Sequence, residues 1–249
     1  MSLISIDDLS IKFRSYSNRN SSLKETFAEF FRPRKGPKPS TDFWALRDIS
    51  LQIRAGDRVG VVGRNGAGKS TFLKSLCRIY EPSQGQVRVE GNMAPLLEIG
   101  AGFHPEFTGR ENIYLNGAIL GYDHKLLREI EPEVIAFAEL QEFIDMPVKY
   151  YSTGMYLRLA FSLATAVHPD ILILDEMFAG GDAAFVERAT RRMKQMIDRA
   201  SIMVLVSHEA ALLSKFCNRI IWLDHGRVKR DGPTSEVLAE YLGASAQAA

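Results

Sequence analysis

Long hydrophobic runs are missing from this chain of 249 residues. The longest apolar stretches are ILIL at 171–174 and IMVLV at 202–206, and the run MYLRLAFSLATAV is interrupted by Arg158. Because a membrane-spanning helix needs about 20 consecutive apolar residues, we expect no span in this chain. The first residues, MSLISIDDLS, carry acids where a signal peptide needs basic residues, so they give no indication of export.

The chain also has few cysteines and almost no net charge. The only two cysteines, Cys77 and Cys217, lie far apart in the sequence, without the spacing of a metal site or a redox pair, so we expect reduced, buried thiols. The formal net charge is +1, which excludes the broad basic field of a nucleic-acid-binding protein. A hydrophobic content of 46% is enough to fill a sizeable core. We therefore expect a globular chain with no nucleic-acid partner.

The strand and helix patterns that are present alternate along the chain. SLISIDDLSIKF alternates apolar with polar residues, and strand patterning returns in ALRDISLQIRAGDRVGVVG, GQVRVEG, DILILDE and SIMVLVSHE. Helical periodicity dominates from about 99 to 165, as in KLLREIEPEVIAFAEL. This alternation predicts an α/β fold with a mostly parallel sheet. Residues 99–165 are then a helical subdomain inserted between two parts of a sheet domain, 1–98 and 166–240.

A glycine-rich stretch, GRNGAGKST, follows the apolar run of DRVGVV and precedes a predicted helix. It fits the G-x-x-x-x-G-K-[ST] pattern of a phosphate-binding P-loop, in the strand–loop–helix context that the motif requires. Glycines let the backbone approach a phosphate closely, and the amides of the loop and of the helix N-terminus point at the anion. The lysine then reaches the terminal phosphates, and the serine hydroxyl reaches Mg²⁺. The predicted ATP-binding set is Gly63, Arg64, Asn65, Gly66, Ala67, Gly68, Lys69, Ser70 and Thr71.

Two acids follow the buried-strand pattern ILIL. Asp175 is expected at the carboxyl end of this strand, where α/β sheets bind ligands, and it can hold Mg²⁺ directly or through water. Glu176 comes next, and because neighbouring side chains point to different sides, it can address a water molecule while Asp175 addresses the metal. His208 follows another apolar strand, VLVS, and is expected near the γ-phosphate.

A second loop of small residues, YYSTGM, opens a helix that leads through HPD into ILILDE. With these motifs in this order, the chain resembles the nucleotide-binding subunits of ABC transporters over roughly residues 3 to 235. Their signature loop, usually LSGGQ, stands here as YSTGM. The resemblance implies that Ser152, Thr153 and Gly154 contact the γ-phosphate of ATP held by the P-loop of a second copy, so that a head-to-tail homodimer completes each site.

The same resemblance assigns roles to further residues. Glu176 matches the general base, and His208 matches the switch histidine. Asp182, in AGGDAAF, matches the D-loop that touches the partner copy. Lys69 and His208 are then expected to stabilise charge on the transferring phosphoryl group. The resemblance also implies a P-loop NTPase (RecA-like) sheet with an antiparallel β subdomain and the inserted helical subdomain, within one ABC ATPase domain over 1–249.

Three features depart from the family pattern or leave it open. Thr153 and Met155 replace a glycine and the glutamine of the signature loop. No clear Q-loop glutamine follows GQVRVEG, and Glu98 is the nearest candidate ligand for Mg²⁺ there. Phe13 and Tyr16 are both candidates for the aromatic ring that stacks on adenine.

The departures look like the polysaccharide-exporter branch, which moves O-antigen, capsule and teichoic-acid chains out of bacteria. LLEIGAGFHPEFTGRENIYLNG, YSTGM and DEMFAGGDAAF carry this resemblance. It implies an ATPase homodimer at the cytoplasmic face of the inner membrane, bound to two copies of a separate membrane-spanning permease that handles lipid-linked polysaccharide. Some members add a carbohydrate-binding domain after the ATPase, and we expect none here. The alternatives are a soluble, non-transport ABC ATPase and the ATPase subunit of a small-solute importer.

Residues 14–44 form a polar, basic and proline-rich insertion with one apolar element. SSLKETFAEFF places Leu23, Phe27, Phe30 and Phe31 on one face of a short helix. Because a helix of ~10 residues is marginal alone, it needs a surface to fold against. That surface is either this protein's own core, the permease or the lipid headgroups at the membrane boundary.

Overall fold

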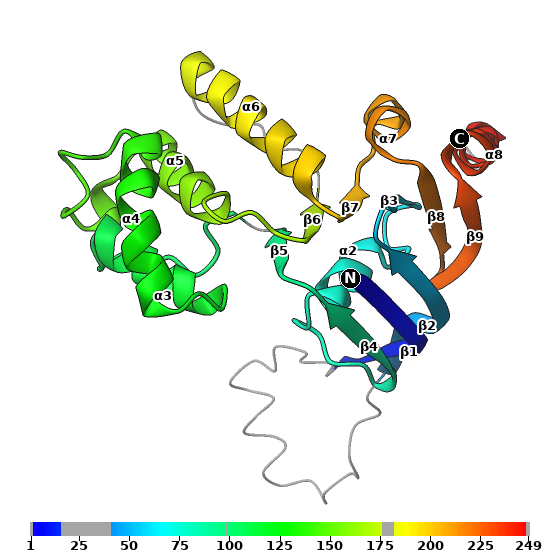
Figure 1. Ribbon diagram of the computed structural model, residues 1–249. Helices are drawn as coiled ribbons and strands as arrows, with labels where there is room; N and C mark the ends of the chain where they lie inside the picture. Colours follow the sequence, from blue (N-terminus) through cyan, green and yellow to red (C-terminus); the bar gives the residue numbers. More distant parts are fainter. Residues whose placement is uncertain (1, 16–40, 98, 176–181, 248–249) are drawn as a thin grey trace, which may run out of the picture.

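The computed structural model describes residues 2–15, 41–97, 99–175 and 182–247, and its strands form two sheets (Figure 1). The smaller sheet has the order β2-β1-β4, and both of its ladders are antiparallel. The larger sheet has the order β5-β6-β7-β3-β8-β9. The strands are β1 (Leu3–Ser15), β2 (Thr41–Arg54), β3 (Arg58–Val62), β4 (Gln84–Glu90), β5 (Met93–Leu96), β6 (Ile171–Asp175), β7 (Ile202–Val206), β8 (Arg219–Asp224) and β9 (Arg227–Pro233).

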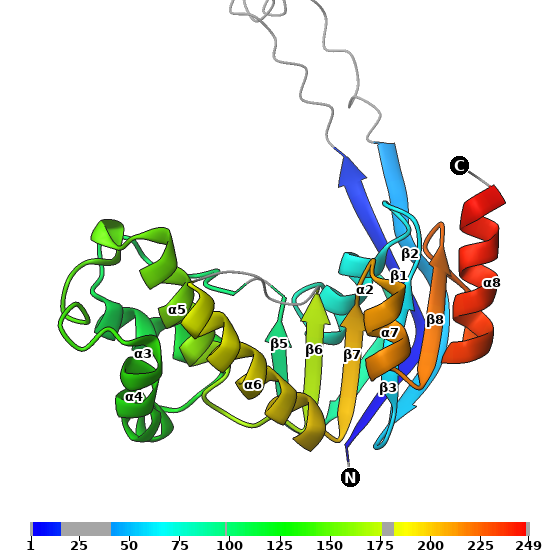
Figure 2. The ribbon, with the colours of Figure 1, turned by 90° about the horizontal axis from the view of Figure 1, so that it is seen from above.

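The larger sheet is parallel from β5 to β8, and only β9 runs antiparallel to its neighbour. The arrowheads of β5, β6 and β7 therefore point the same way (Figure 2). The predicted α/β fold class, with a mostly parallel sheet, an antiparallel sheet and a set of helices, is confirmed. In such a sheet the carboxyl ends of the strands meet at one edge, which is where ligands bind.

Both faces of the larger sheet are buried, and the sequence of β6 shows how. Ile171 and Ile173 point into the core shared with β1, β2 and α2 (Lys69–Leu76), whereas Leu172 and Leu174 point into the core under α6 (Ala183–Arg199). Alternate side chains of a strand face opposite sides, so a strand buried on both faces is apolar throughout.

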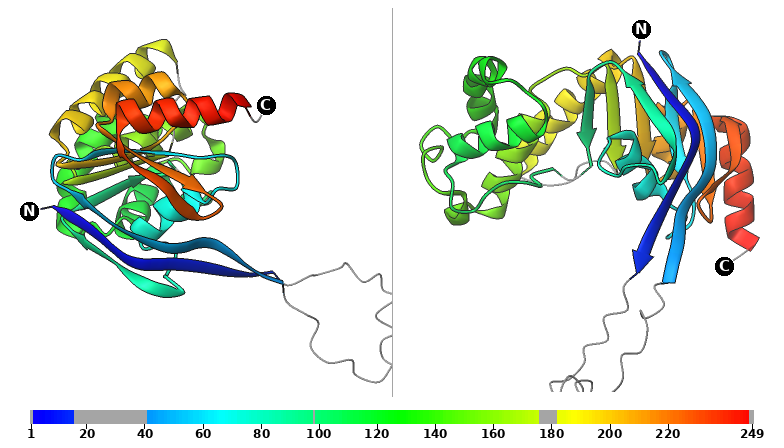
Figure 3. Two further views of the ribbon diagram at one scale, coloured as in Figure 1. Left: turned by 90° about the vertical axis from the view of Figure 1, so that its right-hand side faces the viewer. Right: turned by 90° about the horizontal axis from the view of Figure 1, so that it is seen from below.

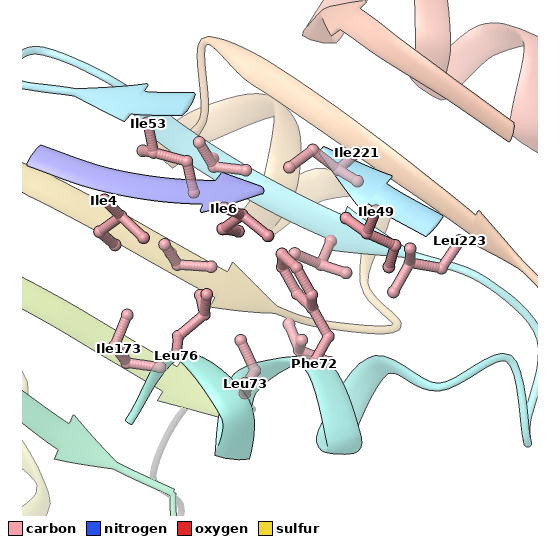
Figure 4. Packing of buried hydrophobic residues seen from close by; sticks show 14 of the residues in the cluster. Ile4, Ile6, Ile49, Ile53, Phe72, Leu73, Leu76, Ile173, Ile221 and Leu223 are labelled. Carbon is pink, nitrogen blue, oxygen red and sulfur yellow. The ribbon is translucent and has the colours of Figure 1, made fainter. Parts of the chain in front are cut away.

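The first of these cores lies between the two sheets. Figure 4 shows the side chains of β1, β2 and α2 meeting those of the larger sheet. Among them are Ile4, Ile6, Ile49, Ile53, Phe72, Leu73, Leu76, Ile173, Ile221 and Leu223, all at most 2% exposed. This packing fixes α2, and with it the loop that precedes α2, against the sheet.

Three of the described helices cover the other face of the larger sheet. They are α6, α7 (Ala210–Phe216) and α8 (Thr234–Gln247), and they lie on the side away from β1 and β2 (Figure 3). The molecule thus has layers, with the small sheet and α2 on one side of the larger sheet and three helices on the other.

The helices α3 (Gly109–Ile119), α4 (His124–Ala138) and α5 (Thr153–Ala164), with a short 3-10 turn at Val148–Tyr150, form a lobe beside the β5 edge (Figure 2). The lobe has its own small core. Polar residues start each helix: Thr108 and Glu111 form a capping box on α3, Asp123 caps α4, and Ser152 caps α5. Among the described helices, none is long and apolar enough to cross a lipid bilayer.

The expected insertion at 14–44 begins later and ends earlier than its composition indicates. The β1–β2 ladder continues through Phe13–Phe43 and Arg14–Asp42 to Ser15–Thr41, because cross-strand pairing outweighs the polar character of these residues. The predicted amphipathic helix with Leu23, Phe27, Phe30 and Phe31 lies outside the described residues.

Candidate functional site

A cavity of about 830 Å³ opens at the carboxyl ends of the parallel strands. Asp175 ends β6, Val206 ends β7, and Leu97 follows β5 directly. The cavity is lined by Phe13, Phe43, Trp44, Ala45, Arg47, Asn65, Gly66, Gly68, Lys69, Ser70, Thr71, Leu97, Asp175, Val206, His208, His225 and Gly226. Residues from the first strand pair, the glycine-rich loop and the ends of β6 and β7 thus meet in one place.

The glycine-rich loop is held in a backbone shape that requires glycine. Gly63 and Gly68 have φ angles of 155° and 103°, and a Cβ on Gly63 would lie 2.4 Å from the Leu223 carbonyl oxygen. A Cβ on Gly68 would lie 2.8 Å from the Ala45 carbonyl oxygen. Gly226 also contacts the loop, because its amide donates to the Ala67 carbonyl oxygen at 3.1 Å. Contacts with β2, β8 and the turn after β8 therefore fix the position of the loop.

The helix α2 begins at this loop with its N-terminus facing the cavity. Gly68 is its N-cap, and no side chain caps the helix there. The first amides of a helix have no intrahelical acceptor and carry partial positive charge. With Lys69, Ser70 and Thr71 all lining the cavity, this helix end provides donors for an anion of phosphate size.

The Lys69 side chain bonds back to the beginning of the loop. The residue is 9% exposed, and its Nζ donates to the carbonyl oxygens of Gly63 at 2.8 Å and Arg64 at 3.2 Å. An ammonium group held in this way supplies a fixed positive charge at the centre of the anion cradle. Gly63, Arg64 and Ala67, the other members of the predicted set, form the loop backbone and do not line the cavity.

Ser70 and Asp175 face the same cavity from α2 and β6. A hydroxyl and a carboxylate are oxygen ligands of the kind Mg²⁺ prefers, and Mg²⁺ is usually held by one or two carboxylates together with substrate phosphates and water. The Ser70 hydroxyl and the Asp175 carboxylate fit Mg²⁺ bound together with a nucleotide. Within the part of the chain that the structure describes, no group of three or more His, Cys, Asp or Glu side chains forms a protein-only metal site.

His208 also lines the cavity, two residues after the end of β7. The Ser207 hydroxyl accepts from the Glu209 amide at 3.0 Å and forms the turn that carries His208. The structure thus brings the predicted residues Lys69, Asp175 and His208 together. Glu176, Glu98 and Tyr16 lie outside the described residues, so their predicted roles stay predictions.

An aromatic wall closes the cavity on the side of β1 and β2. Phe13, Phe43 and Trp44 all line it. The Phe13 ring packs between Phe43, with centroids 5.7 Å apart, and Tyr80, at 5.3 Å. Phe43 is 54% exposed, whereas Phe13 is partly buried against the core. Phe43 is therefore more accessible than Phe13. The Arg47 guanidinium lies 5.9 Å from the centre of the Trp44 ring.

Sequence reasoning named Phe13 but missed Phe43, Trp44, Arg47 and His225. Phe43 and Trp44 lie in the predicted polar insertion, and only the pairing of β2 with β1 brings them to the cavity. His225 sits at φ 47° in the turn between β8 and β9. The strand-like stretch DFWAL, with two adjacent aromatics after a proline-rich segment, indicates a strand here but does not indicate that it pairs with the strand of Phe13.

The signature-loop residues and Asp182 lie elsewhere. Ser152, Thr153 and Gly154 open α5 in the helical lobe, and Asp182 caps α6. The Ser152 Oγ accepts from the Met155 amide at 3.2 Å, and the Asp182 carboxylate accepts from the Phe185 amide at 2.9 Å. None of these residues lines the cavity of its own chain.

Gly154 has no steric reason to be glycine in the part of its own chain that the structure describes. Among the described residues, a Cβ added there would meet only the Ser152 Oγ, at 3.9 Å, which is ordinary van der Waals contact. Glycine lowers helix stability by roughly 1 kcal/mol relative to alanine. A residue that weakens the helix without a local need is typical of a place that another molecule approaches closely.

The sequence matches known proteins over most of its length. Residues 46–179 match the family model described as ABC transporter. The chain is 44% identical to an O-antigen export system ATP-binding protein of Myxococcus xanthus, over 97% of this chain but 56% of that relative. It is 41% identical to a protein of the same name from Klebsiella pneumoniae, over 82% of this chain and 83% of the relative. The chain thus spans little more than half the length of the first of these relatives.

Solved structures share the fold at lower sequence identity. The ATP-binding subunit of an ABC transporter superposes with a TM-score of 0.66 at 23% identity, covering 96% of this chain and 93% of that one. A dimeric ATP-binding cassette with bound ADP and phosphate gives a TM-score of 0.65 at 20% identity, covering 93% and 98%. By its sequence over residues 46–179 and by its close relatives, this chain is a member of the ABC transporter family.

Proposed function

We propose that this chain binds ATP in the cavity and hydrolyses it. The observation that carries the proposal is the meeting of Lys69, the open N-terminus of α2, Asp175 and His208 around one space of about 830 Å³. An anion cradle, an acid at a strand end and a histidine are the parts that phosphoryl transfer from a nucleotide requires.

Each residue of the site has a separate proposed role in ATP binding or hydrolysis. The loop amides and Lys69 bind the phosphates and stabilise the charge that develops on the transferring group. Ser70 and Asp175 would hold Mg²⁺, which, when bound, neutralises phosphate charge. His208 donates a hydrogen bond to the γ-phosphate. Glu176 is proposed to position the attacking water and to accept its proton.

The aromatic wall is proposed to hold the base. Phe13, Phe43 and Trp44 line the cavity from β1 and β2, which belong to a different sheet from the strand of Asp175, and an aromatic face stacks on any nucleobase. Because the Phe13 ring is already packed by Phe43 and Tyr80, the exposed ring of Phe43 contributes the larger free surface.

A second copy of the chain is proposed to complete each site. Ser152, Thr153 and Gly154 start a helix whose N-terminus attracts anions, yet they lie outside the cavity of their own chain. Gly154 leaves space that no described residue of its own chain fills. A head-to-tail homodimer accounts for both features, with Asp182 placed in the same interface.

The transported cargo is proposed from the relatives' names. Relatives from Myxococcus and Klebsiella are named O-antigen export ATP-binding proteins, and a Lactococcus lactis relative, 40% identical over 82% of this chain and 44% of its own length, is named a teichoic acids export ATP-binding protein. We infer that the homodimer sits at the cytoplasmic face of the inner membrane, powers two permease subunits and exports a lipid-linked polysaccharide. The rival functions are a non-transport ABC ATPase and an importer subunit.

The test uses the purified chain with ATP and Mg²⁺. We expect ATP turnover that rises more than linearly with protein concentration, and loss of turnover in Lys69→Ala with retained thermal stability. A wild-type chain that binds no nucleotide would overturn the proposal. Transport is tested separately, by co-purifying the chain with its permease and measuring whether a polysaccharide-lipid, rather than a small solute, raises ATP turnover.

A further inference from the structure

Four charged side chains meet where α4, α5 and α6 come together. Glu139 caps α4 in a left-handed conformation with φ 56°. Its carboxylate accepts from the Arg158 Nη1 of α5 at 3.2 Å and also from the Arg188 Nη1 of α6. The Arg158 Nη1 lies 3.9 Å from the Asp182 carboxylate at the start of α6. We call Glu139, Arg158, Asp182 and Arg188 the ion cluster.

Glu139 is the centre of the ion cluster because one carboxylate serves two guanidiniums. The bond from Arg188, followed by the charges of Arg188 and Arg158, lowers the pKa of Glu139. The Arg158 side chain is 19% exposed. The Nε and Nη2 atoms of Arg188 are buried and have no acceptor among the described residues. Neutralising Glu139 would therefore leave two arginines close together without their shared partner.

The ion cluster lies close to the beginnings of two helices. Ser152 caps α5 and Asp182 caps α6, and each helix carries its cluster arginine within its first two turns. A helix rises ~1.5 Å per residue, so Arg158 and Arg188 each lie about 9 Å along the helix from the capping residue. The cluster thus links one helix N-terminus to the other.

We propose that Glu139 and Arg158 are positioning residues for ATP hydrolysis. They hold the N-terminus of α5 and the N-terminus of α6 at a fixed separation, so that Ser152 and Asp182 meet the partner copy together. The inference rests on the proposed function, in which both helix ends face the nucleotide of the second copy. None of the four cluster residues lines the cavity of its own chain, so the cluster acts on turnover without touching the nucleotide held in that cavity.

A purely structural brace is the competing explanation, and the chain contains a matched control. Glu133 pairs with Arg192, which joins α4 to α6 as Glu139 and Arg188 do. The Arg192 guanidinium also lies 4.0 Å from the centre of the Phe137 ring. This pair is one turn further along α6, and neither side chain forms a hydrogen bond or ion pair with α5 or Asp182 within the described residues.

The experiment compares Glu139→Gln with Glu133→Gln in the full chain. Each variant is measured for kcat and KM of ATP hydrolysis, for nucleotide affinity and for Tm. Since a misplacement of about 1 Å can lower a rate by roughly 100-fold, we expect Glu139→Gln to lower kcat by roughly 10- to 100-fold with nucleotide affinity unchanged. We expect Glu133→Gln to stay within about twofold of the wild type in kcat, at a similar Tm.

A conservative change separates charge from packing. Arg158→Lys keeps the positive charge and should retain more turnover than Arg158→Ala, although lysine loses the planar geometry of the guanidinium. Equal losses of kcat in Glu139→Gln and Glu133→Gln, or losses that follow Tm alone, would overturn the positioning role while the proposed function stands. A wild-type chain without ATP turnover would overturn the proposed function, and this inference with it.

Discussion

Asp175 on β6 is in parallel register with Val206 on β7, and both residues line the cavity. The register places the carboxyl ends of the two strands level with each other, so that His208, two residues after Val206, faces the same space as Asp175. Sheet pairing therefore brings together an acid and a histidine that belong to separate sequence motifs.

Replacing Asp175 with asparagine should abolish turnover without unfolding the chain. Asparagine keeps the size of the side chain but removes the charge that we propose for holding Mg²⁺, so kcat should fall by at least about 100-fold. Asp198→Asn, at an exposed position of α6, is the control and should behave as the wild type. ATP hydrolysis over a range of Mg²⁺ concentrations measures both variants, and near-normal kcat in Asp175→Asn would remove this residue from the site.

Gly154→Ala should separate stability from activity. Alanine fits the open space at Gly154 and favours the helix, so the free energy of unfolding should rise by up to roughly 1 kcal/mol. Turnover should nevertheless fall, because the added methyl group obstructs the nucleotide of the partner copy.

Gly117→Ala is the contrasting control for Gly154→Ala, since a Cβ there would lie 2.2 Å from a Leu127 methyl carbon. Overpacking of this kind should lower Tm. Thermal denaturation and ATP turnover of both variants test the comparison. A Gly154→Ala variant with full turnover would show that no ligand approaches this position.

Phe43→Ala should weaken nucleotide binding more than it weakens the fold. The Phe43 ring is 54% exposed, so its loss leaves little cavity, whereas stacking on a base is worth about 1–3 kcal/mol. The affinity for ATP should therefore fall by roughly 5- to 150-fold. Phe13→Ala should instead lower Tm, because Phe13 packs against the core between the two sheets. Equal affinities of wild type and Phe43→Ala would assign base stacking to another residue.

The stability contributed by Asp145 should be lost in acid. The hydrogen bonds and charge of Arg110 hold the pKa of Asp145 below its ordinary value of 3.8. The contribution of this ion pair is therefore fully present above that ordinary value and disappears as the pH falls through the lowered pKa of the folded state. Tm measured against pH should show a gap between wild type and Asp145→Asn at neutral pH that closes in acid. A gap that is constant with pH would exclude the ion pair as its cause.

The sequence predicts the fold class and the centre of the site because both depend on local patterns. The glycine-rich loop requires positive φ angles at Gly63 and Gly68, and the apolar run before Asp175 marks a strand buried on both faces. The aromatic wall depends instead on pairing between distant segments. Phe43 reaches the cavity only because it is in register with Phe13, and no pattern within residues 41–44 encodes that partner.

The ion cluster, like the aromatic wall, cannot be predicted from the sequence. Glu139 ends α4 in a left-handed conformation that is uncommon for a glutamate, and only the packing of three helices brings Arg158 and Arg188 to it. Periodicity identifies each helix but does not say which side chains meet when helices pack.

Mixing two inactive variants tests the central claim, that one site is built by two copies. Lys69→Ala removes the phosphate-binding lysine, and Ser152→Ala removes the hydroxyl that we propose reaches the partner's nucleotide. In a mixed dimer, one site carries both defects and the other carries neither. ATP turnover of an equimolar mixture is therefore predicted to rise well above the mean of the two separate variants, toward about a quarter of the wild-type rate for random pairing. Turnover that stays at that mean would contradict a site shared between two chains.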